Sequence, residues 1–187
     1  MTAGLTATPA KPTRTVPVVL LAWFAAALAF GPALFRLPFP VPQLAIVALT
    51  VLAIIGLGNW LTGLSWRALV GMHAVRVVGL SFVILGARGL LAPAFASRAG
   101  WGDIIVALGA IGLALASSRP KWLAYLWNSF GALDLIVAVG TATLVIVSGS
   151  RPGVELLTQL PLNLVPTFFV PLLMASHVAI FRRLRAS

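Results

Sequence analysis

Six long apolar stretches, nearly free of charged residues, determine what this chain can fold into. They cover approximately residues 16–35, 43–64, 68–88, 101–118, 122–148 and 160–181. A helix needs about 20 mainly apolar residues to cross the hydrocarbon core of a bilayer. Helices are suited to that environment because they satisfy their own backbone hydrogen bonds. The sequence therefore predicts an all-α fold, a polytopic transmembrane helix bundle with six spans.

The composition agrees with lipid rather than water as the main solvent. Charged residues make up 9% of the 187 residues, and 60% of the residues are hydrophobic. Soluble domains carry about 25% charged residues, which they need to face water. Six spans use most of the chain, so we expect no separate soluble domain. The sequence has no cysteine, which excludes disulfides, thiolate metal ligands and iron–sulfur clusters.

The distribution of basic residues predicts the orientation of the spans. The net charge of +10 is spread singly over the ends of the apolar stretches, so we expect no nucleic-acid binding. With the N-terminus inside, the cytoplasmic side holds eight basic residues and the opposite side four. They are Lys11, Arg14, Arg67, Arg119, Lys121, Arg182, Arg183 and Arg185, against Arg36, Arg88, Arg98 and Arg151. This bias favours cytoplasmic termini, and a multi-pass protein of a bacterial-type inner (plasma) membrane.

The expected domain organisation is simple. Residues 16–183 form the six-span transmembrane domain. A polar, basic and disordered tail is expected over residues 1–15, and a short C-terminal tail over residues 184–187.

Polar side chains inside the predicted spans are the only functional lead. Ionisable groups in a bilayer are energetically costly and each should have a partner. We expect a polar ligand pocket in the cytoplasmic leaflet, lined by Asn59, His73, Arg76, Asn128, Asp134 and His177. Two buried ion pairs are predicted, Arg76 with Asp134, and Arg88 with Asp103 at the adjoining ends of the third and fourth spans.

The two histidines leave several interpretations open. His73 and His177 are predicted at a similar depth on different spans, an arrangement that suits a haem b held by two imidazoles. His73, His177 and Asp134 could instead hold a zinc ion with one open position. The simplest interpretation is that each histidine forms hydrogen bonds between helices. We predict no resident cofactor, and haem b remains the alternative.

The sixth predicted span contains three prolines, Pro161, Pro166 and Pro171. Each proline lacks an N–H and leaves a carbonyl of the preceding turn without its helical donor. In lipid those carbonyls must find other partners, so we expect a kinked helix with donors from its neighbours.

The leading functional hypothesis is a non-enzymatic protein that binds or transports a small polar or anionic ligand. No phosphate-binding loop, zinc-protease motif or serine-hydrolase motif is present, so no catalytic residues are predicted. The alternatives are the redox protein with haem b at His73 and His177, and a structural or accessory membrane subunit.

Overall fold

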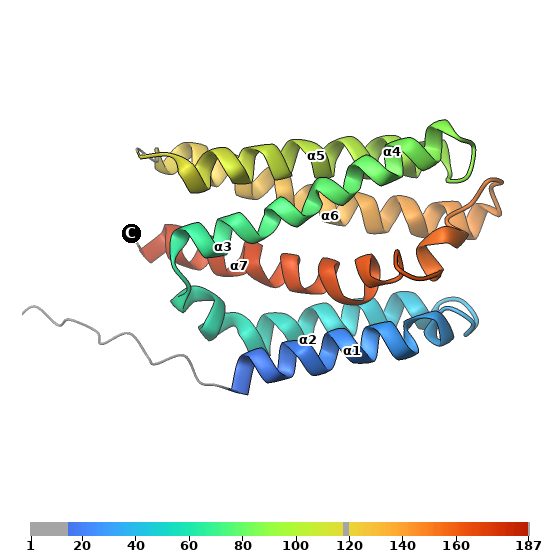
Figure 1. Ribbon diagram of the computed structural model, residues 1–187, viewed down its shortest axis with the longest axis horizontal. Helices are drawn as coiled ribbons and strands as arrows, with labels where there is room; N and C mark the ends of the chain where they lie inside the picture. Colours follow the sequence, from blue (N-terminus) through green and yellow to red (C-terminus); the bar gives the residue numbers. More distant parts are fainter. Residues whose placement is uncertain (1–14, 118–119, 187) are drawn as a thin grey trace, which may run out of the picture.

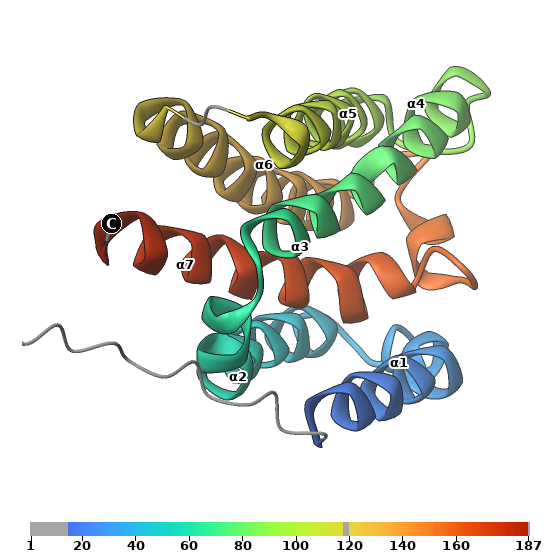
Figure 2. The same ribbon diagram turned by 60° about the vertical axis from the view of Figure 1, so that its left-hand side comes forward.

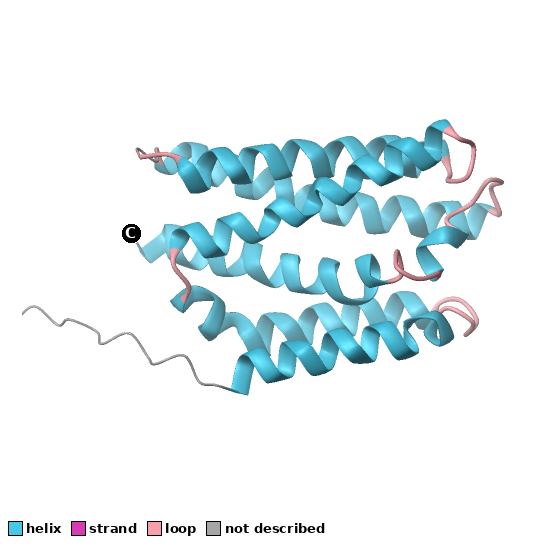
Figure 3. Ribbon diagram, viewed as in Figure 1, coloured by secondary structure: helices cyan, strands magenta, loops and turns pink. Residues whose placement is uncertain are grey.

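The computed structural model describes residues 15–117 and 120–186, and in these residues it contains only helices and loops (Figure 3). Six helices are long and apolar enough to cross a membrane, which confirms the predicted all-α bundle with six candidate spans. The chain is therefore a multi-pass membrane protein in contact with lipid. Lys11, Arg14, Arg119 and nearly all of the predicted N-terminal tail lie outside the described residues.

The spans follow one another in chain order. They are α1 (Thr15–Leu34), α2 (Val41–Gly63), a third span made of α3 (Trp66–Gly71), the 3₁₀ segment η1 (Met72–Val78) and α4 (Gly79–Ala87), then α5 (Pro93–Leu115), α6 (Lys121–Ser148), and η3 (Val165–Phe169) with α7 (Val170–Ala186). A short 3₁₀ turn, η2 (Glu155–Thr158), lies between α6 and η3.

The fourth span begins earlier than the sequence predicted. The segment before residue 101 was expected to be a loop, but α5 begins at Pro93. Proline is well tolerated at the start of a helix because the N–H that it lacks has no helical partner there. The alanines that follow favour the helix. As a consequence Asp103 lies near the middle of its span rather than at its end.

The last span occupies the centre of the bundle. α7 packs against α2, α6 and α3, and it is the most buried of the six spans, whereas α1 is the least buried. Figure 2 shows α7 between the α1–α2 pair and the group formed by the third span, α5 and α6. The beginning of α1 and the end of α7 lie at the same end of the bundle (Figure 1).

The proline-rich start of the last span obtains its missing donors from its surroundings. Pro171 leaves the carbonyl of Thr167 without a helical donor, and the indole Nε1–H of Trp23 in α1 donates to it at 3.1 Å. The carbonyl freed by Pro166 belongs to Leu162 and accepts from the N–H of Val165 at 3.0 Å. Between these positions the backbone forms the wide π turn η3.

Glycines allow the backbones of the third and fourth spans to pack in direct contact. A Cβ on Gly79 would lie 2.5 Å from the Cβ of Asp103 and 2.6 Å from the carbonyl oxygen of Gly100. Such close approach is the usual role of small residues between membrane helices. It brings Asp103 next to the turn of η1 that carries Arg76.

Candidate functional site

The guanidinium of Arg76 connects three spans in the middle of the bundle. Its Nε donates to Asp103 Oδ1 in α5 at 2.6 Å, and its Nη1 donates to the Gly131 carbonyl in α6 at 3.0 Å. Its Nη2 forms an ion pair with Asp134 Oδ2. The side chain of Arg76 is 1% exposed. We refer to Arg76, Asp103 and Asp134 as the charged triad.

One of the two predicted ion pairs is present and the other is not. Arg76 pairs with Asp134, as the sequence suggested. Asp103 was expected to pair with Arg88, but it pairs with Arg76 instead. Arg88 follows the end of α4 and is exposed. The difference follows from the early start of α5, which moves Asp103 away from the membrane end where Arg88 lies.

The formal charges of the triad do not cancel. Two carboxylates share one guanidinium, so the triad carries one net negative charge when both acids are ionised. Both acids lie near the middle of their helices, Asp103 in Pro93–Leu115 and Asp134 in Lys121–Ser148. A charge at this depth is costly because no bulk water solvates it.

A second group of polar side chains adjoins the triad, and we refer to His73, Asn128, Ser176 and His177 as the histidine cluster. All four are 0% exposed. Nδ1 of His177 donates to Asn128 Oδ1 at 2.7 Å, and Asn128 Nδ2 donates back to the His177 carbonyl at 3.1 Å. Nε2 of His73 lies 2.8 Å from Ser176 Oγ. These bonds join the third span, α6 and α7.

The hydrogen bonds define which ring nitrogens carry protons. The hydroxyl of Ser176 donates to the Leu173 carbonyl at 2.8 Å, so it accepts from an Nε2–H of His73. His177 carries its proton on Nδ1, because the Asn128 oxygen can only accept. The other two nitrogens, His73 Nδ1 and His177 Nε2, are buried and have no partner among the described residues.

Gly131 lies where the triad and the histidine cluster meet. Its carbonyl accepts from Arg76. A Cβ at this position would lie 2.6 Å from Cε1 and 2.9 Å from Nε2 of His177. The absence of a side chain therefore lets the imidazole pack on the same turn of α6 that holds the guanidinium.

The contact between the two histidines does not suit a haem. Their ring centroids are 4.3 Å apart and the rings are tilted by 43°, so no space separates them for a porphyrin between two axial nitrogens. One nitrogen of each ring is also occupied by a hydrogen bond, His177 Nδ1 with Asn128 and His73 Nε2 with Ser176. The zinc arrangement has no support either, because no group of three potential metal ligands occurs in residues 15–117 and 120–186.

The polar pocket expected in the cytoplasmic leaflet is closed in this structure. The predicted residues His73, Arg76, Asn128, Asp134 and His177 do come together, but they are packed against one another. Asn59 does not join them, because it is exposed on α2. The expectation assumed that Asn59 would face the bundle, but the interior face of α2 carries Ala53, Leu57 and Leu61 instead.

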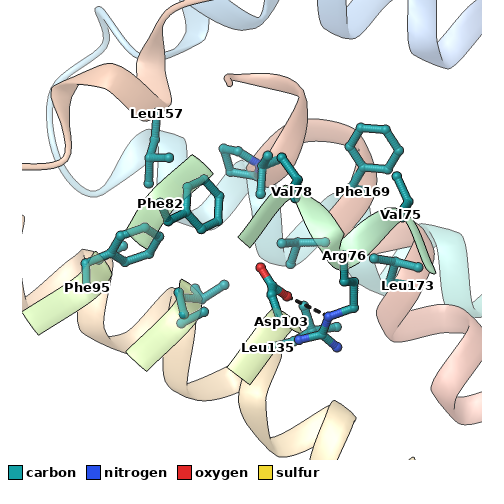
Figure 4. A pocket seen from close by; sticks show the side chains of 17 residues that line it. Val75, Arg76, Val78, Phe82, Phe95, Asp103, Leu135, Leu157, Phe169 and Leu173 are labelled. Atoms are coloured by element: carbon teal, nitrogen blue, oxygen red, sulfur yellow. Dashed lines mark hydrogen bonds and ion pairs between the residues drawn. The ribbon is translucent and has the colours of Figure 1, made fainter. Parts of the chain in front are cut away.

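A cavity of about 60 Å³ begins at the triad and extends toward the end of the bundle opposite the chain termini (Figure 4). Of the described residues that line it, Arg76 and Asp103 are the charged ones. Three aromatic rings also line it, Phe82, Phe95 and Phe169, and the other lining side chains are aliphatic or proline. The cavity therefore combines an apolar wall with a charged group at one end.

Sequence reasoning missed three buried polar residues, Thr141, Asn163 and Ser176. Asn163 Nδ2 donates to the Ala27 carbonyl at 3.0 Å, and Thr167 Oγ1 donates to the Asn163 carbonyl at 2.6 Å. Asn163 and Thr167 hold the first span against the last one. The available signal for Asn163 was its position among the prolines of the last span, where freed backbone groups need polar partners.

Comparison with known proteins identifies a family but no activity. The model of a family described as a domain of unknown function (DUF8737) matches residues 44–185. The chain belongs to this family. The matched region contains the whole charged triad and histidine cluster, whereas α1 lies outside it. No curated protein and no solved structure matches the chain.

Proposed function

We propose that this protein binds a small organic cation inside the membrane, with the alkyl groups of the cation in the cavity and its charge near Asp103. The observation that supports the proposal is the cavity itself, in which Arg76 and Asp103 of the charged triad lie at one end of an apolar wall. The sequence had suggested a polar or anionic ligand attracted by Arg76. Two carboxylates on that guanidinium reverse the expected sign, because the triad is negative rather than positive.

The aromatic lining supports the same choice of ligand. Phe82 and Phe95 pack against each other on one side of the cavity, with their ring centroids 5.4 Å apart and the rings tilted by 57°. Phe169 lies on the wall formed by η3 (Figure 4). Aromatic faces attract cations, and quaternary ammonium groups are commonly recognised in this way. Aromatic faces do not attract anions in this way.

The test uses isothermal titration calorimetry of the detergent-purified protein with tetramethylammonium chloride. We expect saturable binding to the native chain and none to Asp103→Asn. The neutral compound 3,3-dimethylbutan-1-ol, which carries a similar cluster of methyl groups, should bind at least tenfold more weakly. Equal binding of the cation and the neutral compound would contradict the proposal.

A matched pair of variants tests whether the cavity is the site. Ala138→Phe fills the cavity from α6, because Ala138 lines it. Val137→Phe adds a ring at the neighbouring position, which is 40% exposed and does not line the cavity. We expect Ala138→Phe to abolish binding and Val137→Phe to preserve it. The same effect in both variants would overturn the assignment.

The second candidate function is a structural or accessory subunit, in which the buried polar groups only hold helices together. The reciprocal bonds between Asn128 and His177 favour it, since they link α6 to α7 without involving the cavity. A purely structural role predicts no binding of tetramethylammonium to the native chain.

We further propose that both termini face the cytoplasm of a bacterial-type cell, because basic residues are more frequent at that end of the bundle. The sequence contains no cysteine, so single-cysteine variants report position directly. Ser150→Cys lies between α6 and η2, and Ser117→Cys lies between α5 and α6. In intact spheroplasts a membrane-impermeant maleimide should label Ser150→Cys alone; the reverse pattern would invert the orientation.

A further inference from the structure

The negative charge of the triad requires a compensating positive charge inside the bilayer. Arg76 provides one, and it is already shared by Asp103 and Asp134. A second buried carboxylate without its own counter-charge would be energetically costly in this environment. The structure must therefore accommodate either a second cation or a proton at this place.

Among the side chains that the structure describes, no other one supplies that charge. The ionisable groups packed around the triad are His73, in the same helical segment as Arg76, and His177 from α7. Within the described part of the chain, neither histidine forms an ion pair with either carboxylate. The bonded nitrogens of both rings face neutral partners, Ser176 and Asn128.

The third acid of the chain does not belong to this network. Glu155 is exposed at the start of η2 and pairs with Arg151. The compensating positive charge must therefore be held at the carboxyl groups of Asp103 and Asp134.

We infer that Asp103 and Asp134 together hold one proton when the cavity is empty, and that a cation entering the cavity replaces it. One proton leaves for the aqueous phase for each monovalent cation that binds, so the charge of the site stays constant. Asp103 is the group through which the exchange takes place, because it contacts Arg76 and also lines the cavity. The exchange rests on the proposed function, whereas the bound proton does not.

Removing either carboxyl group should remove the need for the proton. In Asp103→Asn the guanidinium faces only Asp134, and in Asp134→Asn it faces only Asp103. Each variant therefore contains a balanced pair of one cation and one anion. Both variants should fold and neither should hold an extra proton.

The bound proton is tested by infrared difference spectroscopy of the full chain in lipid nanodiscs, without any ligand. The native protein should show the C=O stretching band of a protonated carboxyl group, which disappears as the pH is raised. The band should be absent in both Asp103→Asn and Asp134→Asn and unchanged in Glu155→Gln. Absence of the band from the native protein, or its persistence in both Asn variants, would overturn the inference.

Stability provides a second measurement of the same proton. A group that is protonated in the folded state and ionised in the unfolded state loses stabilisation as the pH rises. The thermal midpoint of the native protein should therefore fall as the pH rises from the ordinary titration range of aspartate to the pH at which the band disappears, and level off above it. It should stay constant over that range in the two Asn variants. An equal decline in all three proteins would contradict the inference.

The exchange is tested by calorimetry with tetramethylammonium, which carries no transferable proton. Titrations in two buffers with different ionisation enthalpies should give one proton released per cation bound to the native chain. The Asp134→Asn variant should release none. Failure of the cation to bind would reject the proposed function alone, whereas binding without proton release would reject the exchange.

Discussion

The charged triad and the histidine cluster lie side by side, but they offset the free-energy cost of burying polar side chains in different ways. The triad uses charge, with three donors of Arg76 directed at Asp103, Asp134 and one carbonyl, yet its formal charges do not cancel. The histidine cluster uses neutral hydrogen bonds with defined directions, such as the reciprocal pair between Asn128 and His177.

The difference teaches where function is expected in a membrane bundle. Neutral hydrogen bonds between membrane helices contribute only about 0.6 to 2 kcal/mol each, and they bring no excess charge into the bilayer. The triad carries such an excess when both of its acids are ionised, and two of its members, Arg76 and Asp103, line the cavity. The region that binds a cation is therefore expected on the triad side of Gly131, and the region that fixes helix positions on the other side.

The largest expected effect comes from removing the single cation of the triad. Arg76→Leu leaves two buried carboxyl groups without a counter-charge, and breaking a buried ion pair in this way costs about 3–5 kcal/mol. We expect a large decrease in the thermal midpoint in detergent, or loss of the monodisperse peak in size-exclusion chromatography. Arg88→Leu is the control, because Arg88 is exposed at the end of α4.

A triple variant keeps this first prediction decisive even if Arg76→Leu does not fold. Combining Arg76→Leu with Asp103→Asn and Asp134→Asn removes all charge from the triad. Stability should recover substantially, since replacing a whole buried ionic group by neutral residues is often tolerated. A triple variant as unstable as Arg76→Leu would show that shape, rather than charge, controls this region.

The next effect tests the boundary between the two regions. Gly131→Ala places a Cβ 2.6 Å from Cε1 of His177, and overpacking of this kind typically costs about 1–3 kcal/mol. The matched control is Gly140→Ala on the same helix, where nothing lies within 4 Å of the added Cβ. Gly140→Ala should be neutral or stabilising, since alanine favours helices over glycine by about 1 kcal/mol. Equal thermal midpoints for the two variants would contradict the close contact.

An effect of similar size is expected within the histidine cluster. Asn128→Leu removes both bonds to His177 and leaves its Nδ1–H without a partner, at a cost of about 1–3 kcal/mol. The control is Ser129→Ala, because Ser129 is exposed at the neighbouring position of α6. If the two regions have separate roles, Asn128→Leu should lower the thermal midpoint without changing the affinity for tetramethylammonium. A loss of affinity as large as in Asp103→Asn would break the comparison.

The smallest effect provides a baseline for one neutral hydrogen bond outside both regions. Trp23→Phe keeps an aromatic ring against Phe168 but removes the donor to the Thr167 carbonyl. The expected loss is about 1 kcal/mol. Trp122→Phe is the control, because Trp122 is 66% exposed and lies in the first turn of α6. A larger loss in the control would indicate that interfacial anchoring, not the hydrogen bond, determines the result.

The sequence was sufficient to predict the helical class and the six candidate spans, because both follow from hydropathy and length. Hydropathy did not define every helix boundary. The start of α5 at Pro93 was missed since alanine, arginine and serine between Pro93 and Trp101 resemble a loop in hydropathy. That single error moved Asp103 to the wrong depth and gave it Arg88 as a partner.

Parts of the site could be predicted because few intramembrane residues were available to pair. Arg76 and Asp134 were expected to meet on depth alone, and they do. The rotation of a helix about its own axis could not be predicted from depth. Asn59 has a suitable depth but faces outward, because apolar residues surround α2 almost evenly and its sequence does not show which face is buried.

The central position of α7 has a consequence for biogenesis. Because α7 follows the other five spans in the chain, those spans leave the ribosome before Ser176 and His177 are available to bond with His73 and Asn128. The carbonyl of Thr167 likewise meets the indole of Trp23 across 144 positions of the chain. The early spans therefore enter the membrane with the partners of α7 still unpaired, and insertion of α7 completes these contacts. A ribosome stalled before α7 would leave a loosely assembled intermediate exposed to membrane quality-control proteases.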